Sequence, residues 1–155
     1  MNVTSAIRAL ILLLQNCTVA DAADFKQHAF YKTVKFVPEY PLATLAVPTV
    51  AFSMAGGSNR AKGLGHWERW REPRLQMDIL AADSEQARRI YEKVNEVLLY
   101  DYNATAAGTE GTYGTRYLYG QGLKEVVVGE PNMTVWDEEG RVARIVADVR
   151  VTFTD

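Results

Sequence analysis

The most constraining stretch of this sequence is residues 74–98, where a strand pattern runs directly into a helix pattern. Apolar and polar residues alternate over 74–81, which is the period of a strand with one buried face. Asp83 and Ser84 are good helix caps, and Glu85 follows in the first turn, where the helix dipole favours a negative charge. The apolar residues that come next share one helical stripe: Ala87, Ile90, Tyr91, Val94, Val97 and Leu98.

The rest of the chain supplies a second helix and further strands. Residues 5–16 predict an amphipathic helix that starts near Thr4 or Ser5, and residues 28–37 predict an extended segment. Alternation predicts strands at 50–54, 67–81 and 143–153, with shorter ones at 126–128 and 133–136. The 155 residues therefore predict one α+β domain, 1–155, with a mainly antiparallel sheet, both helices packed on one face and long interaction loops.

Two segments are predicted to be these loops. Residues 56–65 contain four glycines and predict a flexible connection between the strands of a hairpin, 50–54 and 67–81. The loop is not a phosphate-binding P-loop, because Lys62-Gly63 leads toward a strand and not into a Ser or Thr that opens a helix. Residues 101–122 are rich in Gly, Thr, Ala and Tyr without a steady period, which is typical of a loop that serves a partner surface.

Charge and cysteine content narrow the function classes. The formal charge of −2 gives no net attraction to nucleic acid or anionic lipid. Cys17 is the single cysteine, so no internal disulfide forms, and the count fits a reducing compartment. A nucleophilic role for this thiol would need a nearby base, and His28 and His66 lie in unrelated contexts.

No catalytic constellation is visible in the sequence. Glu138 and Glu139 fall in a predicted turn, and Asp78 with Asp83 has no predicted partner for acid–base work. No group of Cys, His and Asp has metal-ligand spacing, and no Ser lies in a nucleophile elbow. We therefore expect no catalytic residue, no cofactor and no metal site, and hence no enzyme.

Basic and aromatic residues gather at 60–74, and tyrosines gather at 100–119. The basic and aromatic residues at 60–74 could contact phosphates and stack on bases. However, Glu68 and Glu72 partly neutralise this segment, and strand alternation divides it between two faces of the sheet. Arg and Trp are favoured anchors of protein–protein interfaces, which is the interpretation we favour. The interface candidates are Arg60, Lys62, Leu64, Trp67, Arg69, Trp70, Tyr113, Arg116, Tyr117 and Tyr119.

Residues 1–22 allow two interpretations. Arg8 followed by six apolar residues, and the small residues around Ala20 and Ala22, loosely resemble a secretion signal. Gln15 and Asn16 interrupt that apolar run early, whereas the amphipathic helix has one coherent face made of Ile7, Leu10, Ile11 and Leu14. The helix is the favoured interpretation, and retention of residues 1–22 stays open at this point.

The order of elements resembles the tail terminator (tail completion) proteins of long-tailed bacteriophages, and more loosely their neck and minor tail proteins. The similar stretches are the first helix at 5–10, the proline-punctuated segment at 40–52, the glycine-rich loop, and above all the run 74–90 from strand through Asp83-Ser84 into the helix. The resemblance covers residues 5–100 and, more weakly, the final hairpin.

This resemblance implies a virion protein that forms a ring, hexameric in the family, which caps the tail tube, ends its polymerisation and joins the tail to the head connector. The implied partners are further copies of the chain, the tail tube protein, head–tail connector or neck proteins, and the tail sheath protein if the tail is contractile. Double-stranded DNA would pass through the lumen without sequence-specific binding.

A ring requires two different adhesive surfaces on each copy. The sequence offers residues 56–70, residues 101–119 and any exposed edge of the sheet. Three alternatives stay open: a head–tail connector or other minor tail protein, a secreted binding protein, and a small hydrolase with an unrecognised site.

Overall fold

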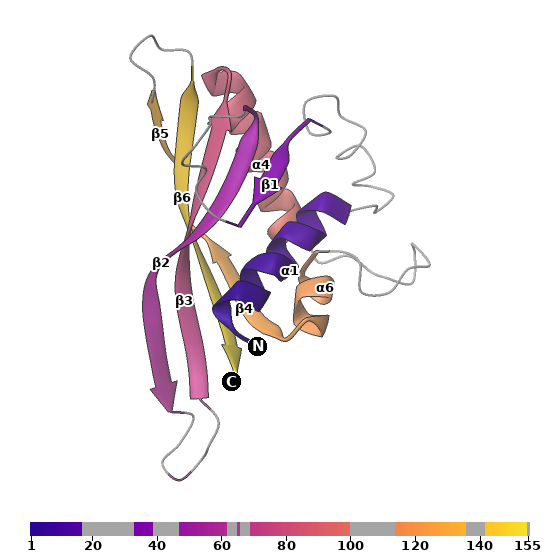
Figure 1. Ribbon diagram of the computed structural model, residues 1–155, viewed down its shortest axis with the longest axis vertical. Coiled ribbons are helices and arrows are strands. Elements are labelled where there is room, and N and C mark those ends of the chain that lie inside the picture. The colour runs from indigo at the N-terminus through magenta and orange to yellow at the C-terminus, as the bar shows by residue number, and fades with distance from the viewer. Residues whose placement is uncertain are drawn as a thin grey trace.

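The computed structural model describes residues 1–16, 33–38, 47–61, 65, 69–99, 114–135 and 142–154. Over these residues the chain forms three helices and one six-stranded sheet (Figure 1). The helices are α1 (Val3–Asn16), α4 (Ser84–Leu99) and α6 (Gly114–Gly120). The strands are β1 (Lys35–Val37), β2 (Thr49–Ala61), β3 (Arg69–Ala81), β4 (Leu123–Val128), β5 (Asn132–Val135) and β6 (Ala143–Thr154).

The sheet has the strand order β1-β2-β3-β6-β4, and β5 also pairs with β6. β1 runs parallel to β2, and every other described pair is antiparallel. β4 and β5 share one side of β6, where β4 covers its second half and β5 its first. The predicted α+β class and mainly antiparallel sheet are confirmed.

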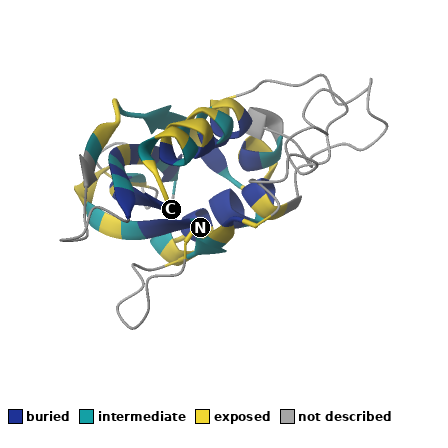
Figure 2. Ribbon diagram, turned by 90° about the horizontal axis from the view of Figure 1, so that it is seen from above, coloured by how far each residue is buried: buried dark blue, intermediate teal, exposed yellow. Residues whose placement is uncertain are grey.

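The helices and the sheet enclose one core between them. α1, α4 and α6 all lie on the same side of the sheet (Figure 1), and buried residues line the interior between the two layers (Figure 2). The alternation predicted for β6 is confirmed, because its odd-numbered residues from Ala143 to Phe153 are all buried. The predicted apolar face of the first helix is also buried, so α1 is an integral part of the core. Its cap is Asn2, whose Oδ1 accepts a hydrogen bond from the Ser5 amide at 2.8 Å, and not Thr4 or Ser5 as predicted.

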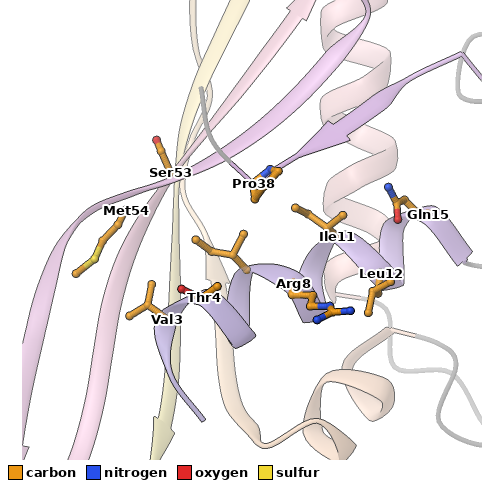
Figure 3. A pocket seen from close by; sticks show the side chains of 10 residues that line it. Val3, Thr4, Arg8, Ile11, Leu12, Gln15, Pro38, Ser53 and Met54 are labelled. Carbon is orange, nitrogen blue, oxygen red and sulfur yellow. The ribbon is translucent and has the colours of Figure 1, made fainter. Parts of the chain in front are cut away.

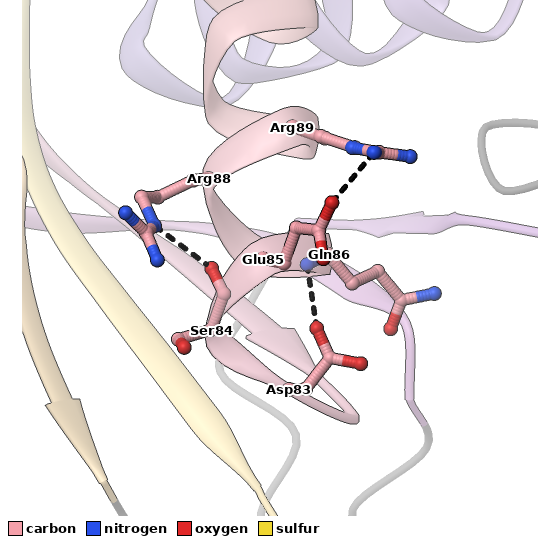
Figure 4. Close-up of polar contacts among 6 residues, drawn as sticks. All are labelled: Asp83, Ser84, Glu85, Gln86, Arg88 and Arg89. Atoms are coloured by element: carbon pink, nitrogen blue, oxygen red, sulfur yellow. Dashed lines mark hydrogen bonds and ion pairs between the residues drawn. The ribbon is translucent and has the colours of Figure 1, made fainter.

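The strand-to-helix junction forms as predicted (Figure 4). The Gln86 amide donates a 2.7 Å hydrogen bond to Asp83 Oδ1, and the Gln86 side chain reaches back to accept one from the Ala82 amide at 2.9 Å. This reciprocal arrangement satisfies two backbone donors at the point where β3 ends and α4 begins. Arg89 forms an ion pair with Glu85, one turn earlier, at 2.6 Å on the exposed side of the first turn.

Two predictions about loops are wrong. The segment predicted as a loop at 101–122 contains α6, so three helices and not two cover the sheet. Its helical period escapes detection because the helix has seven residues with a glycine at each end, and among its described side chains only Leu118 is buried. Packing against β4, α1 and α4 holds the helix in place.

The predicted flexible loop at 56–65 is strand as far as Ala61. A bulge between Met54 and Gly56 lets β2 continue through both glycines, which have φ of +134° and +132°. At Gly57 the partner strand is so close that a Cβ would lie 2.5 Å from the Glu72 carbonyl oxygen. Here the glycines permit two backbones to approach and do not end the strand.

Candidate subunit interfaces

The predicted interface residues divide between two described regions. Arg60, Arg69 and Trp70 lie on the β2–β3 arm, by which we mean residues 57–61 and 69–73 beyond the bulge. Tyr117 and Tyr119 lie on α6, where Tyr117 packs against the core and Tyr119 is 65% exposed. Arg116 belongs to α6 as well, although its side chain is not among those described. Lys62, Leu64, Trp67 and Tyr113 lie outside the described residues.

Several polar side chains of the β2–β3 arm pair with one another. Arg60 pairs with Glu72 at 3.3 Å and lies over the Trp70 ring at 6.0 Å. Ser58 donates a hydrogen bond to Glu72 at 3.1 Å, and Arg71 donates one to the Asn59 side chain at 3.0 Å. Such contacts between exposed groups contribute little stability but hold the side chains in place. Arg60 and Arg71 therefore have acidic or polar partners within the arm, so the arm is not an unpaired basic patch.

A second candidate surface is a groove between α1 and β2 (Figure 3). Its volume is about 610 Å³, and its lining is mostly apolar. Met54 contributes an exposed apolar side chain, at 59%. The alternation at 50–54 puts Met54 on the same face as buried Val50 and Phe52, so the sequence predicts that it is buried. It pairs with Leu75 but is exposed, because it lies beyond the part of the β2 edge that β1 covers, where the helix layer ends. The main lining residues are Val3, Ile7, Arg8, Ile11, Leu12, Pro38 and Met54.

The groove opens at an incompletely paired edge of the sheet. β1 pairs with β2 only from Thr49 to Ala51, and Pro38, which has no amide hydrogen, follows β1 directly. Beyond Ala51, no described strand lies on this side of β2, although the strand continues to Ala61. An edge of this kind presents backbone donors and acceptors to whatever lies beside it.

The opposite edge of the sheet belongs to β4. Among the described strands β4 pairs only with β6, so its other edge has no described strand beside it. Val126, Val127 and Val128 are half-buried there, between exposed Glu125 and Glu130. α6 packs beside β4, and its Tyr119 ring lies 4.9 Å from Lys124 Nζ. We call this surface, residues 117–130, the β4–α6 edge.

Asp78 and Asp83 have separate structural partners. Asp78, on the sheet face away from the helices, is fully buried and accepts hydrogen bonds from Arg144 at 2.7 Å and Gln76 at 2.9 Å. The sequence pattern gave Asp78 no partner, because Arg144 lies 66 residues away in the chain. Asp83 caps α4 and is not brought into a pair with Asp78.

Near the β4–α6 edge, Tyr91 of α4 donates a 2.9 Å hydrogen bond to the Gly129 carbonyl. Burial, and secondarily the charge of Glu130, raise the pKa of the Tyr91 hydroxyl above its ordinary value. The described part of the chain contains no group of three or more metal-ligating side chains. No helix within it is long and apolar enough to cross a membrane.

Comparison with known proteins identifies the fold and not the family. No protein-family model matches the chain, and no curated protein matches it by sequence. Among solved structures, it is similar to a chain of the virion of a native gene transfer agent (GTA) particle, with a TM-score of 0.59 and 12% sequence identity. That similarity covers 100% of both chains, so it shows a shared fold along their whole length.

Proposed function

We propose that this chain is a structural virion protein that forms a ring at the end of a phage tail, where it caps the tail tube, ends its polymerisation and joins the tail to the head connector. The observation that carries the proposal is the fold shared over the full length with a chain of the GTA virion. The virion is the proposed location, and the tail end is the finer position that the strand-to-helix junction and the order of elements suggest.

The geometry of the sheet supports assembly into a ring. A closed ring forms when one surface of a subunit binds a different surface of the next and the rotation closes. The α1–β2 groove and the β4–α6 edge are such a pair, because they differ in shape and belong to opposite edges of one sheet. Six copies is the ring size that the tail terminator resemblance suggests.

The proposed partners are the neighbouring copies, the tail tube protein and the connector or neck proteins, with the sheath protein added in a contractile tail. DNA would pass through the lumen without sequence-specific contacts. The net charge of −2 and the pairing of Arg60 with Glu72 suit a passage that does not hold phosphates tightly. The proposal includes no catalytic, cofactor or metal-binding role.

Two measurements test the proposal: the mass of the purified protein and its position in the virion. We expect light scattering of the purified full chain to give a mass several times 17.3 kDa, and electron microscopy to show rings. Added to the tail tube protein of the same virus, the rings should stop tube growth. A protein that is monomeric at every concentration and absent from virions would contradict the proposal, whereas labelling in the neck away from the tube end would favour the connector alternative.

A further inference from the structure

We infer that the α1–β2 groove of one copy receives the β4–α6 edge of the next, so that the two sheets pair edge to edge and Tyr119 enters the groove. This inference rests on the proposed function, because it specifies how the ring would close. The occupant of the groove is thus a second copy of this chain.

The acceptor surface has the form of a site for an added strand. β1 occupies the edge of β2 only at Thr49–Ala51, and the same edge then continues as strand past the groove. A strand laid in line with β1 would complete the pairing there, with main-chain hydrogen bonds giving affinity and the groove selecting side chains. Met54, 59% exposed, would be covered by such a strand.

The donor surface has the matching features. β4 presents an edge without a described partner strand, and its three consecutive valines are only half-buried. Tyr119 is the most exposed large hydrophobic side chain among the described residues, at 65%. Tyrosine is a favoured interface anchor, since it buries a large ring while its hydroxyl remains able to hydrogen-bond.

Charge also favours this pairing over pairing of like surfaces. Among the described residues that line the groove, Arg8 is the one with an ionisable side chain. On the β4–α6 edge, Glu125 and Glu130 outnumber Lys124, and all three are exposed. Two grooves brought together would oppose cation to cation, whereas groove against edge opposes a cation to a net negative surface.

The location of the two surfaces determines the type of assembly. They belong to opposite edges of the sheet, since β1 and β2 end the strand order at one edge and β4 ends it at the other. A two-fold dimer would engage both surfaces of each copy at once only if the two sheets closed into one barrel. Head-to-tail association leaves one free surface of each kind until the ring closes.

The test uses one substitution on each surface of the full chain. Met54→Arg adds a second cation to the groove that Arg8 also lines, and Tyr119→Arg removes the anchor and adds a cation next to Lys124. Each variant alone should be a monomer at concentrations at least about tenfold above the wild-type assembly midpoint. Mixed in equal amounts, they should form a heterodimer and stop there, because only one intact groove and one intact edge remain.

Leu99→Arg is the matched control, since it adds the same charge at an exposed apolar residue outside both surfaces. It should retain the wild-type mass, and all three variants should keep the wild-type circular dichroism spectrum. Rings that persist in both surface variants, or a mixture that stays monomeric, would overturn the inference and leave the proposed function standing. A wild-type protein that is monomeric at every concentration would overturn the inference outright.

Cysteine cross-linking gives a second readout. In a Cys17→Ser background, Ser53→Cys and Val127→Cys place thiols on the two edges, and oxidation of the double variant should give a ladder of covalent oligomers. Ser53→Cys with Asp148→Cys is the control, because Asp148 lies on β6 inside the sheet. An equal ladder from the control pair would count against edge pairing. Edge pairing in rings found away from the tail end in virions would instead uphold the inference and contradict the proposed function.

Discussion

Arg144 on β6 donates a 2.7 Å hydrogen bond from Nε to Oδ1 of Asp78 on the adjacent strand β3, and its Nη2 contacts the same oxygen. The two groups differ in their environment, because the Asp78 side chain is fully buried while the Arg144 side chain is 22% exposed. Gln76 donates to the other carboxylate oxygen at 2.9 Å. The pair therefore joins the two central strands on the face opposite the helices.

Removing Arg144 should destabilise the fold more than removing the charge of Asp78. Arg144→Met leaves a buried carboxylate without its cation and should lower the free energy of unfolding by about 3 kcal/mol. Asp78→Asn should cost less, about 1–2 kcal/mol, because the Arg144 guanidinium can reach water. Urea denaturation measures both. Arg150→Met, at an exposed position of β6, is the control and should change stability by no more than about 0.5 kcal/mol; equal costs for all three would contradict the structural role.

The two glycines of the β2 bulge should differ in their tolerance of a methyl group. Gly56→Ala meets open space and should cost about 1–2 kcal/mol, the strain of its positive φ. Gly57→Ala adds a clash with the backbone of Glu72 and Pro73, so it should separate the strands of the arm. Hydrogen exchange of the amides at 57–61 and 69–72 reports this directly. Similar protection in the two variants would contradict this prediction, because it would show that the strands stay paired despite the added methyl group.

These glycines also show where sequence patterns reach their limit. The alternation of β6 and the helical stripe of α4 were predicted correctly, because burial on one face imposes a period that the residues themselves carry. Gly56 and Gly57 have no side chain that could show such a period, so a bulged strand and a loop look alike in sequence.

The candidate interfaces were only partly visible in the sequence for a related reason. Tyr119 was identified by its residue type, and its exposure agrees with an interface role. The groove that exposes Met54 depends on how far α1 extends along β2, which is a tertiary relationship. The partner of Asp78 is likewise set by strand pairing across 66 residues. A strand followed by two glycines is the one local signal that could have indicated an exposed Met54.

The start of α4 should depend on its cap more than on its exposed ion pair. Asp83→Ala removes the 2.7 Å hydrogen bond to the Gln86 amide and should cost about 1 kcal/mol. Glu85→Ala removes the contact with Arg89, in which both side chains are largely exposed, and a negative charge that the helix dipole favours, and should cost about 0.3–0.5 kcal/mol. Thermal denaturation of the two variants gives the ranking. A larger loss for Glu85→Ala would mean that the helix start relies on charge and not on capping.

The Tyr91 hydroxyl should make stability depend on pH at the alkaline end. Its pKa in the folded protein is raised above 10.0, first by burial and then by Glu130, so the folded state holds the proton more tightly than the unfolded state. The stabilising contribution is complete below pH 10 and is lost as the pH rises through the folded pKa. Tyr91→Phe should cost about 1 kcal/mol at pH 8, because the Gly129 carbonyl loses its donor.

Above pH 10 the two proteins should converge as the wild-type hydroxyl ionises, since the variant has no hydroxyl to ionise and its free energy of unfolding falls less steeply. Urea denaturation at half-unit steps of pH measures the two slopes. Parallel slopes for wild type and variant would place the Tyr91 hydroxyl in water and remove its role in holding the β4–β5 turn against α4.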